Sequence, residues 1–211
     1  MIRQCFQRRT PLVLAGLLAC IPLLSLAQSS SGSNQYQKII PAQPTVSGAR
    51  HEIVEIFWYG CPHCFRFLPF VERYLKKKPE TITWVRVPGI LRENWAIHAR
   101  AYYTAEALGV IDAIHQPLFD AIHAQKRKLD TEQSLMDFFK EHGVSNEAFK
   151  KTFHSFSVDA KVRRARELGK RFGVTGTPTL VINGQYRTDG SICRCGYNEQ
   201  LKIAERLALQ P

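Results

Sequence analysis

The chain has 211 residues, of which 45% are hydrophobic and 22% are charged, a composition that excludes disorder over the whole length and allows one or two domains. Lysine and arginine outnumber aspartate and glutamate by 29 to 18, which gives a formal net charge of +11. Beyond the N-terminal region, no apolar run has the length that a membrane-spanning helix needs.

The first 27 residues have the pattern of a secretory signal sequence. Basic residues and no acidic ones precede an apolar run over residues 11–24, and small residues lead up to Ala27. This pattern predicts export, with cleavage after Ala27. A short membrane anchor is disfavoured by the length of the run. A lipoprotein signal with lipid on Cys20 is disfavoured because the run continues beyond that cysteine.

Cleavage there changes the charge and the cysteine count. The mature chain keeps 26 basic and 18 acidic residues, a net charge of +8, and four of the six cysteines: Cys61, Cys64, Cys193 and Cys195. Exported proteins work in oxidising compartments, where disulfides persist. We therefore expect a periplasmic protein whose cysteines take part in disulfide chemistry.

The first half of the mature chain predicts two strands with a helix between them. Residues 28–34 form a serine-rich leader, and residues 36–46 contain two prolines and are expected to be an extended edge segment. The β-branched and aromatic run Glu52–Tyr59 predicts a buried strand, and a helix begins at Cys61. Thr81–Val87 alternates as a second strand.

The second half predicts a helical block followed by a hairpin. Helical patterns cover residues 92–108, 112–124, 131–142, 145–153 and 158–172. Strands over 179–182 and 185–188 flank Asn183-Gly184, a typical two-residue hairpin turn. A terminal helix covers 198–209.

This order predicts an α/β fold in which a small mixed sheet with flanking helices is interrupted by an α-helical subdomain. The leader and edge segment occupy 28–48, and the two halves of the sheet domain occupy 49–90 and 161–211. The helical insertion occupies 91–160, a block too long to be a loop.

Cys61-Pro62-His63-Cys64 lies where a buried strand gives way to a helix. A Cys-x-x-Cys pair in that position is typical of a redox-active dithiol. Free backbone N–H groups and the helix dipole stabilise a Cys61 thiolate there, and Pro62 suits the first helical position. A protonated His63 would add a positive charge nearby. Stabilising the thiolate stabilises the reduced pair, so its disulfide is a strong oxidant.

The two sulfurs are expected to play different parts. Cys64 lies on an apolar helix face that runs to Leu75, which buries it and leaves Cys61 at an exposed tip. Cys61 would then attack and be attacked, and Cys64 would resolve the mixed disulfide. The alternatives are an inert disulfide, or half of a zinc site completed by Cys193 and Cys195.

The run Glu55-Ile56-Phe57-Trp58-Tyr59-Gly60-Cys61-Pro62-His63-Cys64 resembles the active-site segment of DsbA-type thiol:disulfide oxidoreductases. Gly176-Thr177-Pro178-Thr179 resembles the cis-proline loop of the thioredoxin superfamily. The resemblance covers nearly the whole mature chain. It implies a thioredoxin fold with an inserted α-helical subdomain and an enzyme that uses no soluble cofactor. It gives Cys61, Cys64 and His63 the roles of nucleophile, resolving cysteine and thiolate-stabilising residue.

The resemblance also implies roles around the dithiol. Pro178 is expected to be cis and to face the cysteines, and Thr177 to offer backbone hydrogen bonds to an extended client peptide. Glu55 matches a buried family glutamate that relays the proton of the resolving cysteine, with a surface acid as the alternative. Trp84 and Arg86 compete to be its partner. Thr177 also resembles the disulfide-isomerase branch, so a reductase or isomerase is an alternative function.

Three other features lie outside these motifs. We expect a disulfide between Cys193 and Cys195 that is structural in effect, with a second redox pair or a metal clip as alternatives. Aromatic residues around the dithiol would either form an exposed collar for clients or belong to the core. Basic clusters at 76–78, 126–128 and 163–164 are expected to be solvated faces, since no nucleic-acid motif accompanies them.

The sequence thus predicts an exported, monomeric protein disulfide oxidoreductase. It would donate its Cys61–Cys64 disulfide to reduced client proteins through a mixed disulfide at Cys61. The resemblance implies reoxidation by a DsbB-like membrane quinone reductase. No metal and no nucleic-acid partner is expected. A metal-binding or chaperone module that uses both cysteine motifs as ligands is the alternative from another class.

Overall fold

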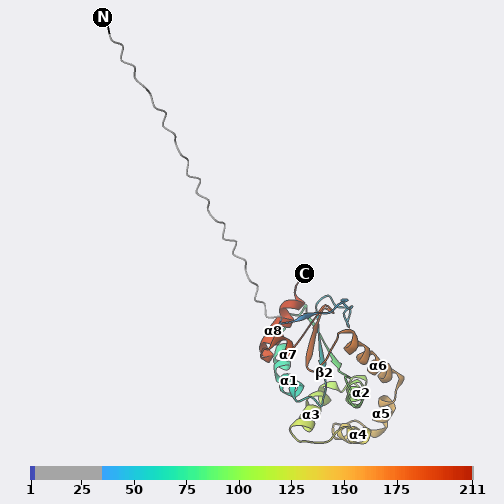
Figure 1. The fold of residues 1–211 in the computed structure, drawn as a ribbon. Coiled ribbons are helices and arrows are strands. Elements are labelled where there is room, and N and C mark those ends of the chain that lie inside the picture. The colour runs from blue at the N-terminus through green and yellow to red at the C-terminus, as the bar shows by residue number, and fades with distance from the viewer. Residues whose placement is uncertain (3–34, 211) are drawn as a thin grey trace. The chain divides into compact units, whose positions relative to one another are not determined.

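The computed structural model describes Met1, Ile2 and residues 35–210. From residue 3 onward, the predicted signal sequence lies outside the described residues, and so do the cleavage point after Ala27, the alternative at Cys20 and the serine-rich leader. Residues 35–210 fall within one compact unit (Figure 1). Among the described residues, no helix is both long and apolar enough to cross a bilayer.

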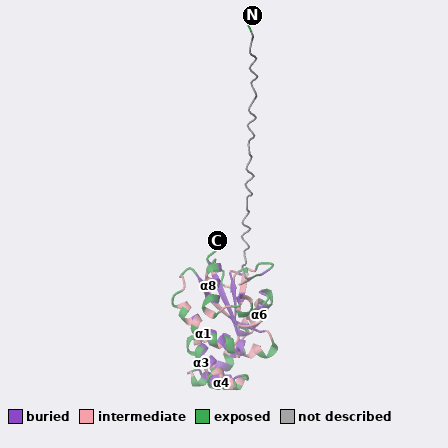
Figure 2. Cartoon of the chain, turned by 60° about the vertical axis from the view of Figure 1, so that its left-hand side comes forward, coloured by how far each residue is buried: buried purple, intermediate pink, exposed green. Residues whose placement is uncertain are grey.

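A five-stranded mixed sheet with the order β1-β5-β4-β2-β3 forms the centre of this unit. The strands are β1 Gln37–Lys38, β2 Glu52–Phe57, β3 Thr83–Pro88, β4 Thr179–Ile182 and β5 Tyr186–Asp189. Strand β2 pairs parallel with β3 and antiparallel with β4, and all its residues are buried. Its β-branched and aromatic composition suits a strand covered on both faces. Figure 2 shows this buried strand layer inside a more exposed shell of helices.

The helices follow the predicted order. They are α1 Pro62–Leu75, α2 Ala96–Ala107, α3 Ile111–His123, α4 Glu132–Glu141, α5 Asn146–Phe153, α6 Phe156–Arg171, α7 Gly190–Cys193 and α8 Tyr197–Ala208, with a 3₁₀ turn, η1 Glu93–Trp95, before α2. Helices α2 to α6 lie between β3 and β4 in the chain, which confirms that a helical block interrupts the sheet. The four-residue α7 was not predicted, because one helical turn is too short to show a period.

Alternation along the strands separates two apolar clusters. Ile53 packs in a cluster with residues of α1 and α8, whereas its neighbour Val54 packs in the larger cluster with residues of α2 to α6. Strand β4 repeats the pattern, with Leu180 and Ile182 in the first cluster and Val181 in the second. Successive side chains of a strand point to opposite faces, so a single buried strand supplies both clusters. In Figure 1, α1 and α8 lie on one side of the sheet, and α2 and α6 on the other.

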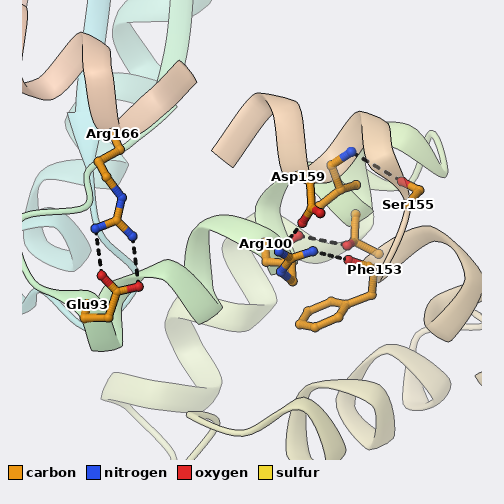
Figure 3. A network of polar contacts seen from close by, with 8 residues as sticks. Glu93, Arg100, Phe153, Ser155, Asp159 and Arg166 are labelled. Atoms are coloured by element: carbon orange, nitrogen blue, oxygen red, sulfur yellow. Dashed lines mark hydrogen bonds and ion pairs between the residues drawn. The ribbon is translucent and has the colours of Figure 1, made fainter. Parts of the chain in front are cut away.

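Polar contacts tie the ends of the helical block together (Figure 3). Arg100 on α2 donates a hydrogen bond of 2.6 Å to the Phe153 carbonyl and forms an ion pair with Asp159 on α6. Arg166 on α6 donates two hydrogen bonds, of 2.8 and 3.0 Å, to the Glu93 carboxylate in η1. These contacts fix α6 against the start of the block, and α6 leads directly into the loop before β4.

The β4–β5 hairpin turns at Asn183 and Gly184, whose φ angles are +52° and +66°. Positive φ at both positions places the turn where it is predicted. Ile182 pairs with Tyr186, however, so the connection has three residues, and the second strand begins at Tyr186 and not at the predicted Gln185. Gly184 also accepts a hydrogen bond of 2.9 Å from the Gln43 N–H. A Cβ at Gly184 would overlap the Gln43 carbonyl, so the turn needs glycine for space as well as for conformation.

Candidate active site

The Cys61–Cys64 pair stands at the start of α1, directly after the buried strand β2. Cys61 is the N-cap of the helix, Pro62 is its first residue, and the Cys64 N–H lies 3.5 Å from the Cys61 sulfur. Proline fits this position because the first helical N–H groups have no partner within the helix. Both cysteines are free, so the structure shows the reduced dithiol.

Cys61 is more enclosed than the sequence suggests. Cys64 is 1% exposed, as predicted, but Cys61 is only 7% exposed, so the expected exposed tip is wrong. The loop before β4 covers it: the Cys61 sulfur lies 3.2 Å from the Thr177 carbonyl oxygen. The Thr177–Pro178 peptide bond is cis, as expected for this loop. Helix periodicity could not reveal the cover, because Thr177 lies 116 residues along the chain.

The Cys61 thiol is strongly acidified. Its pKa is lowered from 9.0 to about 5, first because the Cys64 side chain donates a hydrogen bond to the Cys61 sulfur. Burial opposes this effect, while hydrogen bonds from the Thr177 side chain and from the backbone N–H groups of Cys64 and His63 add to it. At neutral pH, Cys61 is therefore a thiolate.

The pKa of the Cys64 thiol moves in the opposite direction. Burial raises it well above its ordinary value, and the adjacent Cys61 and the charge of Glu55 raise it further. Two chemically identical side chains thus have different protonation states near pH 7. This division matches an attacking sulfur and a resolving sulfur.

Glu55 lies beneath the dithiol on β2 and is 2% exposed, which overturns the surface-acid alternative. In the parallel register, Glu55 is opposite Arg86, whose Nε donates a hydrogen bond of 3.1 Å to the carboxylate. Arg86 also donates a hydrogen bond of 2.6 Å to Glu72 on α1. Burial raises the pKa of Glu55, and Arg86 opposes that rise. Arg86 is therefore the partner, although Trp84 adjoins the site.

His63 is the second residue of α1, directly before Cys64. Its ring is exposed, and Nδ1 lies 3.0 Å from Nη2 of Arg66. Arginine can only donate, so Nδ1 accepts this hydrogen bond. The contribution of His63 to the Cys61 thiolate is its backbone N–H. The stabilisation of the thiolate by the His63 ring stays a prediction.

The aromatic residues near the dithiol divide between core and rim. Phe57 and Tyr59 are fully buried, so they form no exposed collar. Trp58 is half-buried and stacks on Trp95, with ring centroids 3.9 Å apart. Phe65 is also half-buried and stacks on His123, with ring centroids 5.0 Å apart.

Two histidines of the helical block hold the strand end that leads into the dithiol. The Tyr59 hydroxyl lies 2.9 Å from His115 Nδ1, and the Tyr59 carbonyl lies 2.8 Å from His123 Nε2. Burial lowers the pKa of His115 well below its ordinary value, so its ring is neutral. Sequence reasoning missed these contacts, because scattered histidines with no regular spacing carry no positional information.

A groove of about 330 Å³ adjoins the dithiol. Its lining comes from α1, the cis-proline loop, the start of α7 and α8: His63, Thr175, Gly176, Thr177, Pro178, Asp189, Gly190, Ser191, Tyr197 and Gln200. A cleft lined by the half-buried Thr177 and by Pro178 suits an extended peptide. The groove therefore brings together the dithiol end of α1 and the loop that the sequence singled out.

Cys193 and Cys195 are joined in a disulfide, as expected. They are therefore not free thiolates that could complete a zinc site with Cys61 and Cys64. Within residues 35–210, no group of three or more His, Cys, Asp or Glu side chains lies together as a metal site would require.

An acidified cysteine at a helix N-terminus, facing a cis-proline loop on a thioredoxin-type sheet, defines a thiol:disulfide oxidoreductase of the thioredoxin superfamily. Residues 81–193 match the family described as the DSBA-like thioredoxin domain. The chain is 35% identical over 200 residues to the thiol:disulfide interchange protein DsbA of Pseudomonas aeruginosa, covering 93% of this chain and 94% of the relative. It is 36% identical over 208 residues to DsbA of Azotobacter vinelandii, covering 94% and 96%.

Solved structures agree with this assignment. The crystal structure of Pseudomonas aeruginosa DsbA superposes with a TM-score of 0.78 at 35% identity, covering 83% of this chain and 91% of that one. DsbA from Xylella fastidiosa gives a TM-score of 0.75 at 29% identity, covering 82% and 93%. The chain belongs to the DsbA family and has its thioredoxin fold with an inserted helical subdomain.

Proposed function

We propose that the chain is exported to the periplasm, where it oxidises reduced client proteins with its Cys61–Cys64 disulfide. The observation that supports this most directly is the contrast between the two thiols, with the pKa of Cys61 lowered to about 5 and that of Cys64 raised. The thiol with the lower pKa is the better leaving group in disulfide exchange. Cys61 is therefore easily displaced from a mixed disulfide with a client, and the client leaves in its oxidised form.

The exchange proceeds in two displacements. A client thiolate attacks the Cys61 sulfur, the Cys61–Cys64 bond breaks, and Cys64 leaves with the electron pair and takes up a proton. A second client thiolate then attacks the client sulfur of the mixed disulfide, and Cys61 leaves as a thiolate. The client gains a disulfide, and its two electrons remain on the dithiol.

Residues around the dithiol serve these steps. Glu55 supplies and receives the proton of Cys64, since burial raises the pKa of both groups and the Glu55 charge acts on Cys64. The backbone at Thr177 and the groove beside Pro178 hold the client segment in an extended form. The monomeric chain is then reoxidised by a DsbB-like membrane quinone reductase and needs no soluble cofactor.

Trapping tests the assignment of the attacked sulfur. A Cys64→Ser variant retains Cys61, whose thiolate should attack the disulfide of oxidised glutathione, release one glutathione and accumulate as a mixed disulfide, detected by mass spectrometry. The matched Cys61→Ser variant should form little adduct, because Cys64 is buried and protonated. Equal trapping by both variants would contradict the assignment of Cys61 as the nucleophile.

The reduction potential separates an oxidase from a reductase or isomerase. The Cys61–Cys64 pair should equilibrate with glutathione near the oxidising end of the scale, at about −120 mV, which is the established value for DsbA, the protein that gives this chain's family its name. A potential close to that of thioredoxin, about −270 mV, would instead assign the chain as a reductase or isomerase.

A further inference from the structure

The Cys193–Cys195 disulfide has no part in the steps above. It encloses a single residue, Arg194, and the entropic stabilisation from a disulfide grows with the length of the loop that it closes. The adjoining α7 is already held by Asp189, whose carboxylate accepts hydrogen bonds from the N–H groups of Ser191 (2.8 Å) and Ile192 (2.9 Å). Structural support alone is therefore a weak explanation for this bridge.

The two cysteines of this bridge differ in burial. Cys193 is buried in the cluster under α8, whereas Cys195 is half-buried and open to an incoming thiol. Arg194 between them is exposed, and its backbone is left-handed with φ +50°. The positive charge of Arg194, which adjoins both cysteines in the chain, favours the thiolate that forms when the disulfide opens.

The surroundings of this bridge provide room for a substrate. A hollow of about 720 Å³ is lined by Gln35, Gln37, Ser191, Ile192, Cys193, Arg194 and Cys195. Ser191 also lines the groove that contains His63 and Pro178. The hollow and the groove thus meet at Ser191, past which a client segment in the groove can extend to the second disulfide.

We propose that Cys193–Cys195 is a second thiol:disulfide exchange site whose substrate is a cysteine thiol of an extended client chain. A client thiolate attacks the Cys195 sulfur, the Cys193–Cys195 bond breaks, and Cys193 leaves as a thiolate. A second client thiolate attacks the client sulfur, and Cys195 leaves. The client is oxidised by two electrons, and the second pair becomes a dithiol.

The Cys61–Cys64 disulfide of a second copy of the chain restores this dithiol. Two further exchanges move the electron pair from Cys193 and Cys195 to Cys61 and Cys64. Only this restoring step rests on the function proposed above.

The first experiment isolates the second site in a Cys61→Ser/Cys64→Ser variant, with reduced glutathione as the probe. Alkylation and mass spectrometry under native conditions should show the two-thiol form of Cys193 and Cys195. If the bond stays oxidised in the folded variant at glutathione concentrations that open it in denaturant, the bridge is structural and the proposal is wrong. This outcome is independent of the first pair, which the variant lacks.

Two further variants in the same background test the mechanism. Cys193→Ser should form a mixed disulfide with oxidised glutathione faster than Cys195→Ser, and equal rates would contradict attack at Cys195. Arg194→Gln should slow opening of the bridge about threefold if the pKa of the leaving thiol rises by about one unit. Arg171→Gln, which removes an exposed charge at the end of α6, is the matched control and should leave the rate unchanged.

The restoring step has its own test. A reduced Cys61→Ser/Cys64→Ser variant is mixed with an oxidised Cys193→Ser/Cys195→Ser variant. Mass spectrometry should show the disulfide moving to the second site. The Cys193–Cys195 dithiol of the first variant could instead persist, although reduced glutathione opens the same disulfide. In that case the second copy of the chain is not the oxidant, and the proposed exchange site is unaffected.

Discussion

The reduction potential of the Cys61–Cys64 pair should change its pH dependence at about pH 5. The pKa of Cys61 is lowered to about 5 while that of Cys64 is raised, and the disulfide itself does not titrate. Below the pKa of Cys61, reduction takes up two protons, and above it only one. A two-electron couple shifts by about 30 mV for each proton per pH unit, so the slope should fall from about 60 to about 30 mV per pH unit.

The magnitude at neutral pH follows from the same values. A thiol with the ordinary pKa of 9.0 stays protonated at pH 7, whereas one with a pKa of about 5 favours the thiolate by about two pKa units. Two units correspond to about 2.7 kcal/mol of stabilisation of the reduced state. Expressed as a potential, this is about 60 mV toward a stronger oxidant.

The same acidification links stability to pH. The pKa of Cys61 is lower in the folded protein than in the unfolded chain, so its ionisation stabilises the folded state. This stabilisation is complete only above the unfolded pKa of about 9 and is lost as the pH falls through the folded pKa of about 5. The reduced protein should therefore gain stability against urea between about pH 5 and pH 8. The oxidised protein has no such contribution from Cys61, because its sulfurs do not titrate.

Both dependences are measurable on a Cys193→Ser/Cys195→Ser variant, in which the first pair is observed alone. Glutathione equilibria between about pH 4 and pH 8 give the potential, and the ultraviolet absorbance of the thiolate gives the pKa of Cys61 independently. A single slope of about 60 mV per pH unit over the whole range would show that Cys61 is not acidified.

A change at Cys64 tests the cause of the acidification. Cys64→Ala removes the side chain that contributes most to lowering the pKa of Cys61, so the absorbance titration should move to higher pH. Cys64→Ser keeps a hydrogen-bond donor and should restore part of the shift. An unchanged pKa in Cys64→Ala would show that the backbone N–H groups at the start of α1 are sufficient.

Three further substitutions test contacts that hold the site. Arg86→Met leaves the buried Glu55 carboxyl without its ion-pair partner and should cost about 3–5 kcal/mol in urea unfolding; an unchanged stability would show that the pair is not needed. Tyr59→Phe removes the 2.9 Å contact to the buried His115 and should lower the free energy of unfolding by about 1–3 kcal/mol. An unchanged free energy would show that solvent replaces this contact at His115. Gly184→Ala meets both a positive φ and a backbone carbonyl, so it should lower stability by about 1 kcal/mol or more, and full stability would contradict the described turn.

Features encoded over a few adjacent residues were predictable. The strand Thr179–Ile182 has the predicted bounds, and Asn183-Gly184 turns as expected, because turn chemistry is a property of the dipeptide itself. The helices between β3 and β4 fall within a few residues of their predicted ranges, because a period of 3.6 residues is readable over ten or more positions. The two-residue β1 and the four-residue α7 lie below the length at which a period appears.

Local sequence patterns were enough to define the class of chemistry: a Cys-x-x-Cys pair between a buried strand and a helix, in a chain whose order of elements interrupts a sheet with helices. How the pair is enclosed became clear only from the folded chain. The Thr177 carbonyl contacts Cys61 although the two residues are 116 positions apart in the chain, and strand register places Arg86 opposite Glu55. These contacts join residues that share no local pattern, and they depend on packing and register, which no single segment of the sequence contains.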